Sequence, residues 1–168
     1  MEQWTDAYLD IETTGLSCFY DYITVIGIYR CNGKDDRLVQ LVGGEVTRDN
    51  LLKALEGVNR VYTYNSRRFD LPFIRASLRV DIEARFDHRD LMYECWRNNL
   101  YGGFKAVERQ LGIYRQLQGI GGFEAVLLWW RYQNYGEQNA LALLLQYNKE
   151  DVVNLKALRE RLEGANDA

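Results

Sequence analysis

The hydrophobic pattern changes its period along the chain, and this change limits the folds that the chain can adopt. Residues 7–11, 22–30 and 37–42 are rich in apolar, β-branched and aromatic residues, which predicts three strands joined by turns such as Asn32-Gly33. Helical and strand patterns then alternate: a helix at 47–55, a strand at 61–64, a helix at 70–78 and a short strand at 87–91. The rest of the chain predicts helices, at 104–111, 123–132 and 140–162, the last as one long helix or two in succession. This order predicts an α/β fold with a mixed five-stranded sheet, an antiparallel meander plus parallel strands, flanked by helices.

Length and composition favour one ordinary globular domain over residues 1–168. Hydrophobic residues make up 47% of the chain, and no apolar run is long enough to predict a membrane span or a secretory signal. The cysteines Cys18, Cys31 and Cys95 are odd in number and form no C-x-x-C pair, so we expect a reducing, cytoplasmic setting rather than a disulfide framework. The net charge of −3 argues against non-specific binding of nucleic acid, unless several acids serve as metal ligands.

Two acidic residues stand at the end of the first predicted strand, in Asp10-Ile11-Glu12. Side chains alternate along a strand, so Asp10 and Glu12 project to the same side with Cα atoms about 6.6 Å apart, while Leu9 and Ile11 face the core. Two neighbouring carboxylates repel each other unless a cation lies between them. Taken alone, the pair is also compatible with an exposed acidic strand end before a turn.

A third acid, Asp151, lies on the apolar stripe of the last predicted helix, between Asn148 and Leu155. Tyr147 precedes it by one turn and therefore lies beside it. An aspartate on a core-facing stripe needs a partner, which is either a cation or a basic residue such as Lys149.

A fourth acid, Asp70, stands where a predicted strand gives way to a predicted helix. In isolation, this position favours a helix N-cap. Arg67 and Arg68 precede it and Arg75 and Arg79 follow it, and these arginines form either a solvated helix face or a guide for phosphates. Together, the four acids are the oxygen ligands that two divalent cations need for an in-line phosphoryl displacement.

The acids stand in three motifs that resemble those of the DEDD superfamily of 3′→5′ exonucleases, in its tyrosine-containing subgroup. The matching stretches are DIETTG at 10–15, YNSRRFDLPFI at 64–74 and YNKED at 147–151, and GGFKAVERQLGI at 102–113 resembles the helix between the second and third motifs. The resemblance spans nearly the whole chain in the expected order. It implies a ribonuclease-H-like fold and release of mononucleotides from the 3′ end of single-stranded DNA or RNA.

The resemblance also implies a role for each matching residue. Asp10 should contact both of two cations, Mg²⁺ or Mn²⁺. Glu12 and Asp151 should complete the cation on the nucleophile side, and Asp70 should hold the second cation, directly or through water. Tyr147 should orient the attacking water, which the metal must activate because a tyrosine is a poor base at neutral pH.

Four further residues are expected to contact the substrate, with Thr13 and Leu16 at the terminal nucleotide and Asn65 and Phe69 along the path of the strand. Ser66 departs from the family, whose members often have glycine there, and we expect this to alter how closely the backbone approaches the strand. The short chain carries no added nucleic-acid-binding region, so a protein partner could supply substrate affinity.

Two other functions are compatible with the sequence: a non-catalytic binding or scaffold module of the same fold, and an endonuclease such as a ribonuclease H. Loss of an acid usually marks the first, and none of the four is lost. The tyrosine four residues before the last aspartate favours the exonuclease over the second. His88, the only histidine, is too far from Asp151 in sequence to replace this tyrosine, and we interpret it as structural.

Overall fold

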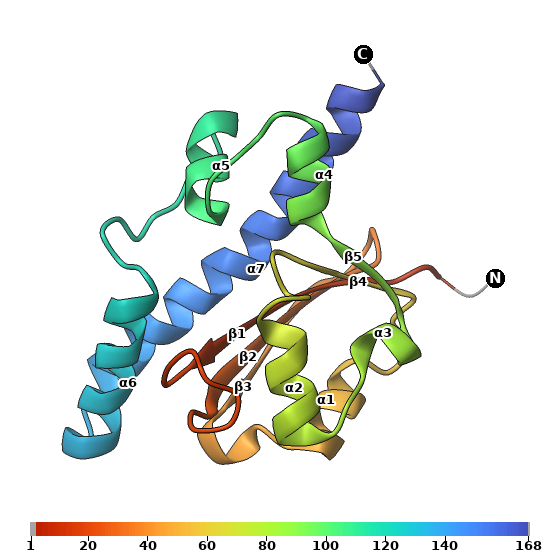
Figure 1. The fold of residues 1–168 in the computed structure, drawn as a ribbon. Coiled ribbons are helices and arrows are strands. Elements are labelled where there is room, and N and C mark those ends of the chain that lie inside the picture. The colour runs from red at the N-terminus through yellow and green to blue at the C-terminus, as the bar shows by residue number, and fades with distance from the viewer. Residues whose placement is uncertain (1–2, 168) are drawn as a thin grey trace.

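The computed structural model describes residues 3–167, and its centre is a twisted mixed sheet (Figure 1). Within these residues the sheet has five strands in the order β3-β2-β1-β4-β5. Their bounds are β1 Asp6–Thr13, β2 Ile23–Cys31, β3 Asp36–Val42, β4 Arg60–Thr63 and β5 Asp87–Asp90. The sequence-based prediction of a mixed five-stranded sheet is therefore confirmed.

The strand directions place the ends of three strands at one edge of the sheet. β1 pairs with β2 in antiparallel orientation, with Asp10 opposite Gly27, and β2 also pairs with β3 in antiparallel orientation. β4 runs parallel to β1 and β5 runs parallel to β4. The carboxyl ends of β1, β4 and β5 therefore meet at one edge, where parallel α/β sheets commonly place their ligands.

Helices cover both faces of the sheet (Figure 1). On one face, α1, α2 and α3 pack over Leu9, Ile11 and the apolar residues of β2. On the other face, α4, α5 and α7 pack over Tyr8 and Tyr62, and α6 packs with the first half of α7. The helix bounds are α1 Arg48–Ala54, α2 Asp70–Leu78, α3 Ile82–Arg85, α4 Leu91–Arg97, α5 Phe104–Leu111, α6 Gly122–Tyr135 and α7 Gln138–Asn166, with a 3-10 turn at Gly43–Glu45.

The long helix α7 is one element rather than two, and it crosses the sheet diagonally (Figure 1). Its buried residues recur at three- and four-residue spacing, from Leu144 through Val152 and Leu155 to Leu162. Because this buried stripe is continuous, the same face of one helix packs against the protein along its length. The stripe carries Tyr147 and Asp151 into the protein interior.

None of the helices that the structure describes combines the length and the apolar composition needed to cross a lipid bilayer.

Candidate metal and active site

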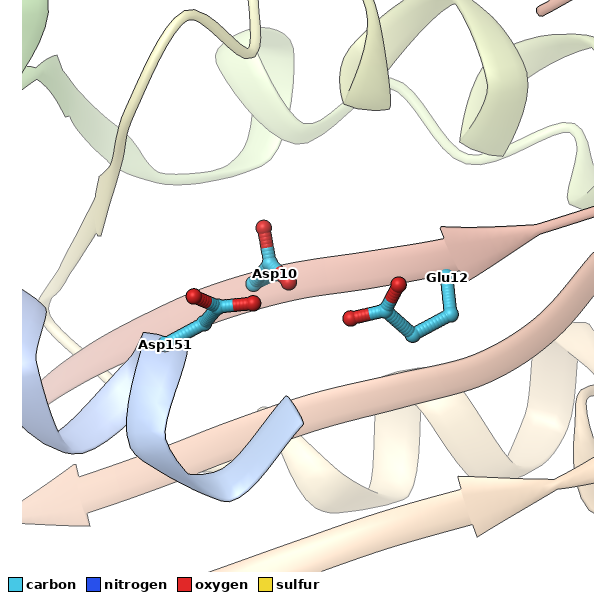
Figure 2. Close-up of side chains that lie close together, drawn as sticks. All are labelled: Asp10, Glu12 and Asp151. Atoms are coloured by element: carbon cyan, nitrogen blue, oxygen red, sulfur yellow. The ribbon is translucent and has the colours of Figure 1, made fainter. Parts of the chain in front are cut away.

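Three carboxylates from two distant segments meet near the carboxyl end of β1 (Figure 2). Asp10 and Glu12 project from the same side of β1, as the strand alternation predicts, and Asp151 reaches them from α7. One oxygen of each carboxylate lies within 4.8 Å of the oxygens of the other two. Residues separated by about 140 positions in the sequence therefore form one acidic cluster, which we call the acidic triad.

The helix that carries Asp151 lies close to the sheet because β2 has a glycine below it. A Cβ atom on Gly27 would lie 2.2 Å from Oδ1 of Asn148, so no other residue fits there without movement of the helix side chain. Oδ1 of Asn148 accepts a hydrogen bond from Nε2 of Gln40 at 3.0 Å, and Gln40 also donates to the Leu145 carbonyl at 2.8 Å. Asn148 in turn donates to the Asp10 carbonyl at 3.4 Å. These contacts fix the position of α7 relative to the first acid of the triad.

Asp70 lines the same cavity as the acidic triad, but its carboxylate oxygens are not among those that lie within 4.8 Å of one another. It is the first residue of α2, whose N-cap is Phe69, so the N-cap that the isolated sequence favours is not formed by its side chain. Instead, Oδ2 of Asp70 accepts a hydrogen bond from the backbone N–H of Ile11 at 3.2 Å. Because Ile11 stands between Asp10 and Glu12, this bond ties the fourth acid to the strand that carries the first two.

The four acids destabilise one another's charged forms. Burial, followed by the negative charges of Asp151 and Glu12, raises the pKa of Asp10 well above its usual range. Burial and the charge of Asp151 do the same to the pKa of Glu12, and burial raises the pKa of Asp70 to about 7. Burial also raises the pKa of Asp151, although Arg115 and Lys105 oppose this shift.

A buried arginine that sequence patterns did not single out partly neutralises the triad. Nη2 of Arg115 donates to Oδ1 of Asp151 and to Oε1 of Glu108, both at 2.6 Å, and Nε donates to Oε2 of Glu108 at 3.0 Å. Nδ2 of Asn154 supplies a further hydrogen bond to Glu108 at 2.8 Å. All three charged side chains are less than a tenth exposed. The arginine therefore fixes one oxygen of Asp151 and leaves the other for a ligand.

Tyr147 contacts a lysine, Lys105, which the sequence patterns also did not single out. Nζ of Lys105 donates a hydrogen bond to the Tyr147 hydroxyl at 2.7 Å and lies 4.6 Å from the centre of the ring. Burial and the nearby carboxylates raise the pKa of Tyr147 above its ordinary value, so the hydroxyl keeps its proton at neutral pH. One feature of the sequence indicates a special role for Lys105. This lysine lies in the first turn of α5, where the helix dipole disfavours a positive charge, so another interaction must stabilise its charge there.

The acids and the tyrosine line one open cavity of about 270 Å³. Thr13, Leu16 and Phe69, three of the four residues expected to contact substrate, also line it. The Leu16 side chain is 87% exposed at its rim. Tyr64 and Phe104 add a stacked aromatic pair to the wall, with ring centres 5.1 Å apart.

Asn65, the fourth expected substrate contact, follows Tyr64 but does not line the cavity. Its backbone has a left-handed conformation, with φ of 56°, and its N–H donates to Oδ1 of Asp90 at 2.7 Å. Asp90 also accepts the N–H groups of Arg67 and Met92, both at 3.2 Å. Asp90, which no sequence pattern singles out, holds the second motif at the sheet edge.

His88 and Ser66 also hold the second motif in place. Nε2 of His88 lies 2.8 Å from the Thr63 hydroxyl and 3.2 Å from the Ser66 hydroxyl, and Nδ1 lies 3.2 Å from Oε1 of Glu83. His88 and Ser66 are buried. The Ser66 side chain thus packs into the protein and not into the cavity.

The donor set of the acidic triad fits a hard divalent cation. Carboxylate oxygens are the ligands that Mg²⁺ and Mn²⁺ prefer. Oε1 of Glu12 is buried and accepts no hydrogen bond from any described residue, which leaves it free to bind a cation. A cation would also offset the burial and the repulsion that disfavour the charged forms of these acids.

Comparison with known proteins identifies the family. A family model described as the RNase_H superfamily matches residues 7–163, nearly the whole chain. The chain belongs to the RNase_H superfamily. None of the functionally curated proteins that were compared matches it.

Several solved structures share the fold of this chain. A structure described as the apo form of a nuclease is 17% identical, with a TM-score of 0.66 over 95% of this chain and 72% of that chain. NrnC of Brucella melitensis bound to pGG is 19% identical, with a TM-score of 0.62 over 98% and 76% of the two chains. NrnC with bound Mg²⁺ is 18% identical, with a TM-score of 0.61 over 98% and 77%. At these identities the similarity shows a common ribonuclease-H-like fold.

Proposed function

We propose that this RNase_H superfamily member is a metal-dependent 3′→5′ exonuclease of the tyrosine-containing DEDD subgroup, acting on single-stranded DNA or RNA. The observation that carries the proposal is the convergence of Asp10, Glu12 and Asp151 within 4.8 Å, in a cavity that Asp70 and Tyr147 also line. An acidic triad with a buried, unpartnered carboxylate oxygen is costly to a fold unless a cation binds it. The Mg²⁺ described in NrnC, a protein of the same fold, supports this proposal.

The residues divide the work between holding cations and holding the reacting water. Asp10, Glu12 and Asp151 would hold one cation, and Asp10 and Asp70 would hold a second. Bound divalent cations supply the activation of the attacking water and the stabilisation of the leaving oxygen in such sites. Tyr147 remains protonated and Lys105 occupies an acceptor lone pair of its hydroxyl, so the hydroxyl proton is available to orient the attacking water. Thr13 and Leu16 would contact the terminal nucleotide in the cavity, and Asn65 and Phe69 would lie along the path of the strand.

The experiment that tests the proposal is a cleavage assay on 5′-labelled single strands of DNA and RNA, with Mg²⁺, Mn²⁺ or a chelator. Short oligonucleotides such as pGG belong in the substrate panel, because NrnC binds pGG. The wild type should produce a ladder that shortens from the 3′ end, and both the chelator and Asp10→Asn should abolish it. Asp49→Asn, which removes an exposed acid from the first turn of α1, is the matched control and should retain activity.

Two outcomes would replace the proposal by another function. Cleavage of a circular single strand would show an endonuclease, because a circle has no 3′ end. No cleavage of any substrate by the wild type with either metal would favour a non-catalytic binding module. The label at the 5′ end distinguishes stepwise release of 3′ nucleotides from a single internal cut.

A further inference from the structure

Aromatic rings and arginines continue from the wall of the cavity along the second motif. Tyr64, which stacks on Phe104 in that wall, is followed closely in sequence by Arg67 and Arg68, both exposed. The Asp90 carboxylate holds the backbone of this segment at the sheet edge through Asn65 and Arg67. The segment therefore leads outward from the cavity along a fixed path.

The two arginines lie on aromatic rings of the neighbouring helix α4, which follows β5 and packs against α7 (Figure 1). The Arg68 guanidinium lies 5.4 Å from the ring centre of Trp96, and the Arg67 guanidinium lies 5.7 Å from that of Tyr93. The two rings meet edge to face, with centres 5.3 Å apart. We call this surface, formed by Arg67, Arg68, Tyr93, Trp96 and Arg97, the α4 track.

A shallow groove of about 140 Å³ beside the track gathers positive charge. Arg67, Arg89 and Arg97 line it, together with the acids Asp90 and Glu94. The Asp90 carboxylate is already engaged by three backbone N–H groups.

The arginines in and beside the α4 track differ in whether an acidic side chain neutralises their charge. Arg67 is paired with Glu83 and Arg89 with Asp87, whereas Arg68 and Arg97 form no ion pair with any residue of the range 3–167. Two unpaired guanidinium groups are therefore available to an anionic ligand, in a protein whose net charge is −3.

We propose that the α4 track binds the unpaired part of a nucleic-acid strand whose 3′-terminal nucleotide lies in the cavity. This inference rests on the proposed function. Arg68 and Arg97 contact phosphates, and Trp96 and Tyr93 offer faces or edges to bases, the combination that single-strand-binding surfaces use. An acidic protein segment would satisfy the arginines but would not use the aromatic rings on which they lie. Glu94, which lies in the same groove, opposes the strand's charge and weakens the binding.

The test compares a dinucleotide with single strands of about 12 nucleotides, in DNA and in RNA. Binding is measured by fluorescence anisotropy in chelator, so that it does not depend on cleavage. In the double variant Arg68→Ala/Arg97→Ala, the Kd of the longer strand should rise about tenfold, and the slope of log K against log salt should fall in magnitude by about 1.4, because each phosphate contact on a single strand contributes about 0.7. Arg37→Ala, which removes an exposed arginine from β3 at the opposite end of the sheet from β5, is the control and should leave both values unchanged.

A variant that binds more tightly than the wild type controls for loss of binding through misfolding. Glu94→Gln removes the opposing charge and should lower the Kd of the longer strand, which loss of structure cannot mimic. With metal present, the double variant should raise KM for the longer strand and leave cleavage of the dinucleotide unchanged. If the wild type binds both lengths equally, or if Arg37→Ala weakens binding as much as the double variant, the α4 track is not the binding surface. A wild type that binds the long strand preferentially but cleaves nothing would instead refute the proposed exonuclease.

Discussion

At the scale of single residues, Arg115 is the side chain on which the charge balance of the site most depends. Its guanidinium bonds Asp151 and Glu108, and all three side chains are less than a tenth exposed. Removal of one partner of a buried ion pair leaves the other charge buried and uncompensated. We therefore expect Arg115→Met to lower the free energy of unfolding by about 3–5 kcal/mol, measured by urea denaturation in chelator.

An exposed pair of the same chemistry is the control for this prediction. Arg131 donates to Glu137, and their side chains are 55% and 38% exposed. Solvent screens such a pair, so Arg131→Met should cost less than about 1 kcal/mol. Equal losses in the two variants would mean that the Arg115 network contributes no more than a surface ion pair.

Lys105 and Tyr147 should act as one unit. Each of Lys105→Met and Tyr147→Phe should lower kcat/KM roughly 10²-fold, because each removes part of a single hydrogen-bonded arrangement beside the acids. The double variant should lose little more than the worse single variant. Steady-state kinetics on one single-stranded substrate measures this coupling, with Lys53→Met, an exposed lysine of α1, as the control. Losses that multiply would show that the two groups act independently.

The residues that could be predicted from the sequence are those that stand in short motifs on recognisable elements. Strand alternation predicts that Asp10 and Glu12 share a side, and the apolar stripe of α7 predicts that Asp151 is buried. Arg115 lies in a loop with no periodicity, so nothing in its neighbourhood indicates that it is buried beside Asp151. Its contact depends on the packing of α5, α7 and the loop between α5 and α6, which no local pattern encodes.

At the scale of elements, the sequence predicts strands and helices with a clear hydrophobic period to within a few residues. α2 and α5 have the predicted bounds, and β2 and α7 differ by only a few residues at each end. Two short helices, α3 and α4, are not distinguished by the sequence pattern, because an element of fewer than two turns shows too few residues for a period to be visible. The sequence order also leaves open whether residues 140–162 form one helix or two, and the unbroken stripe of α7 decides for one.

The close contact between β2 and α7 leads to a prediction at Gly27. Gly27→Ala places a methyl group where Oδ1 of Asn148 lies, and Asn148 is fully buried and bonded to Gln40 and Asp10. We expect a loss of about 1–3 kcal/mol in the free energy of unfolding and a weaker affinity for Mn²⁺, because the helix that carries Asp151 must shift.

The control for this prediction is another glycine near the same sheet. A Cβ atom on Gly44 would meet no atom within 4 Å, so Gly44→Ala should leave the affinity for Mn²⁺ unchanged. Thermal unfolding and calorimetric titration with Mn²⁺ measure both effects. A Gly27→Ala protein with wild-type metal affinity would show that the position of α7 does not control the acidic triad.

At the scale of the whole molecule, the net charge of −3 averages over local surroundings of different character and is therefore a poor guide to binding. Four acids gather in one cavity, where Lys105 and the buried Arg115 offset part of their charge. Outside the cavity, Arg68 and Arg97 form no ion pair with any residue of the range 3–167. Because burial raises the pKa of the four carboxylates, both the pH and a bound cation should alter the stability of the fold through them.

The stability of the metal-free protein should fall as pH rises through neutrality. Asp70 has a pKa of about 7 in the folded protein against an ordinary value of 3.8 in an unfolded chain, so the folded state binds a proton that the unfolded state has released. The stability that this proton supplies is complete below pH 4 and is lost as pH rises through about 7, a change of up to about 4 kcal/mol from this group. Urea denaturation in chelator at pH 5 and pH 8 measures the change. Asp70→Asn should reduce it and Asp49→Asn should not.

A cation should reverse the loss at high pH, because it stabilises the charged carboxylates that burial disfavours. At pH 8, Mn²⁺ at about 100 times its Kd should raise the free energy of unfolding by about 2.7 kcal/mol in the wild type. Asp10→Asn removes one ligand and should lose most of this gain, although it should be more stable than the wild type in chelator, since it also removes one repelling charge. A variant that is less stable than the wild type in chelator at pH 8 would show that Asp10 supports the fold rather than straining it, and that the acidic triad is a structural feature and not a cation site.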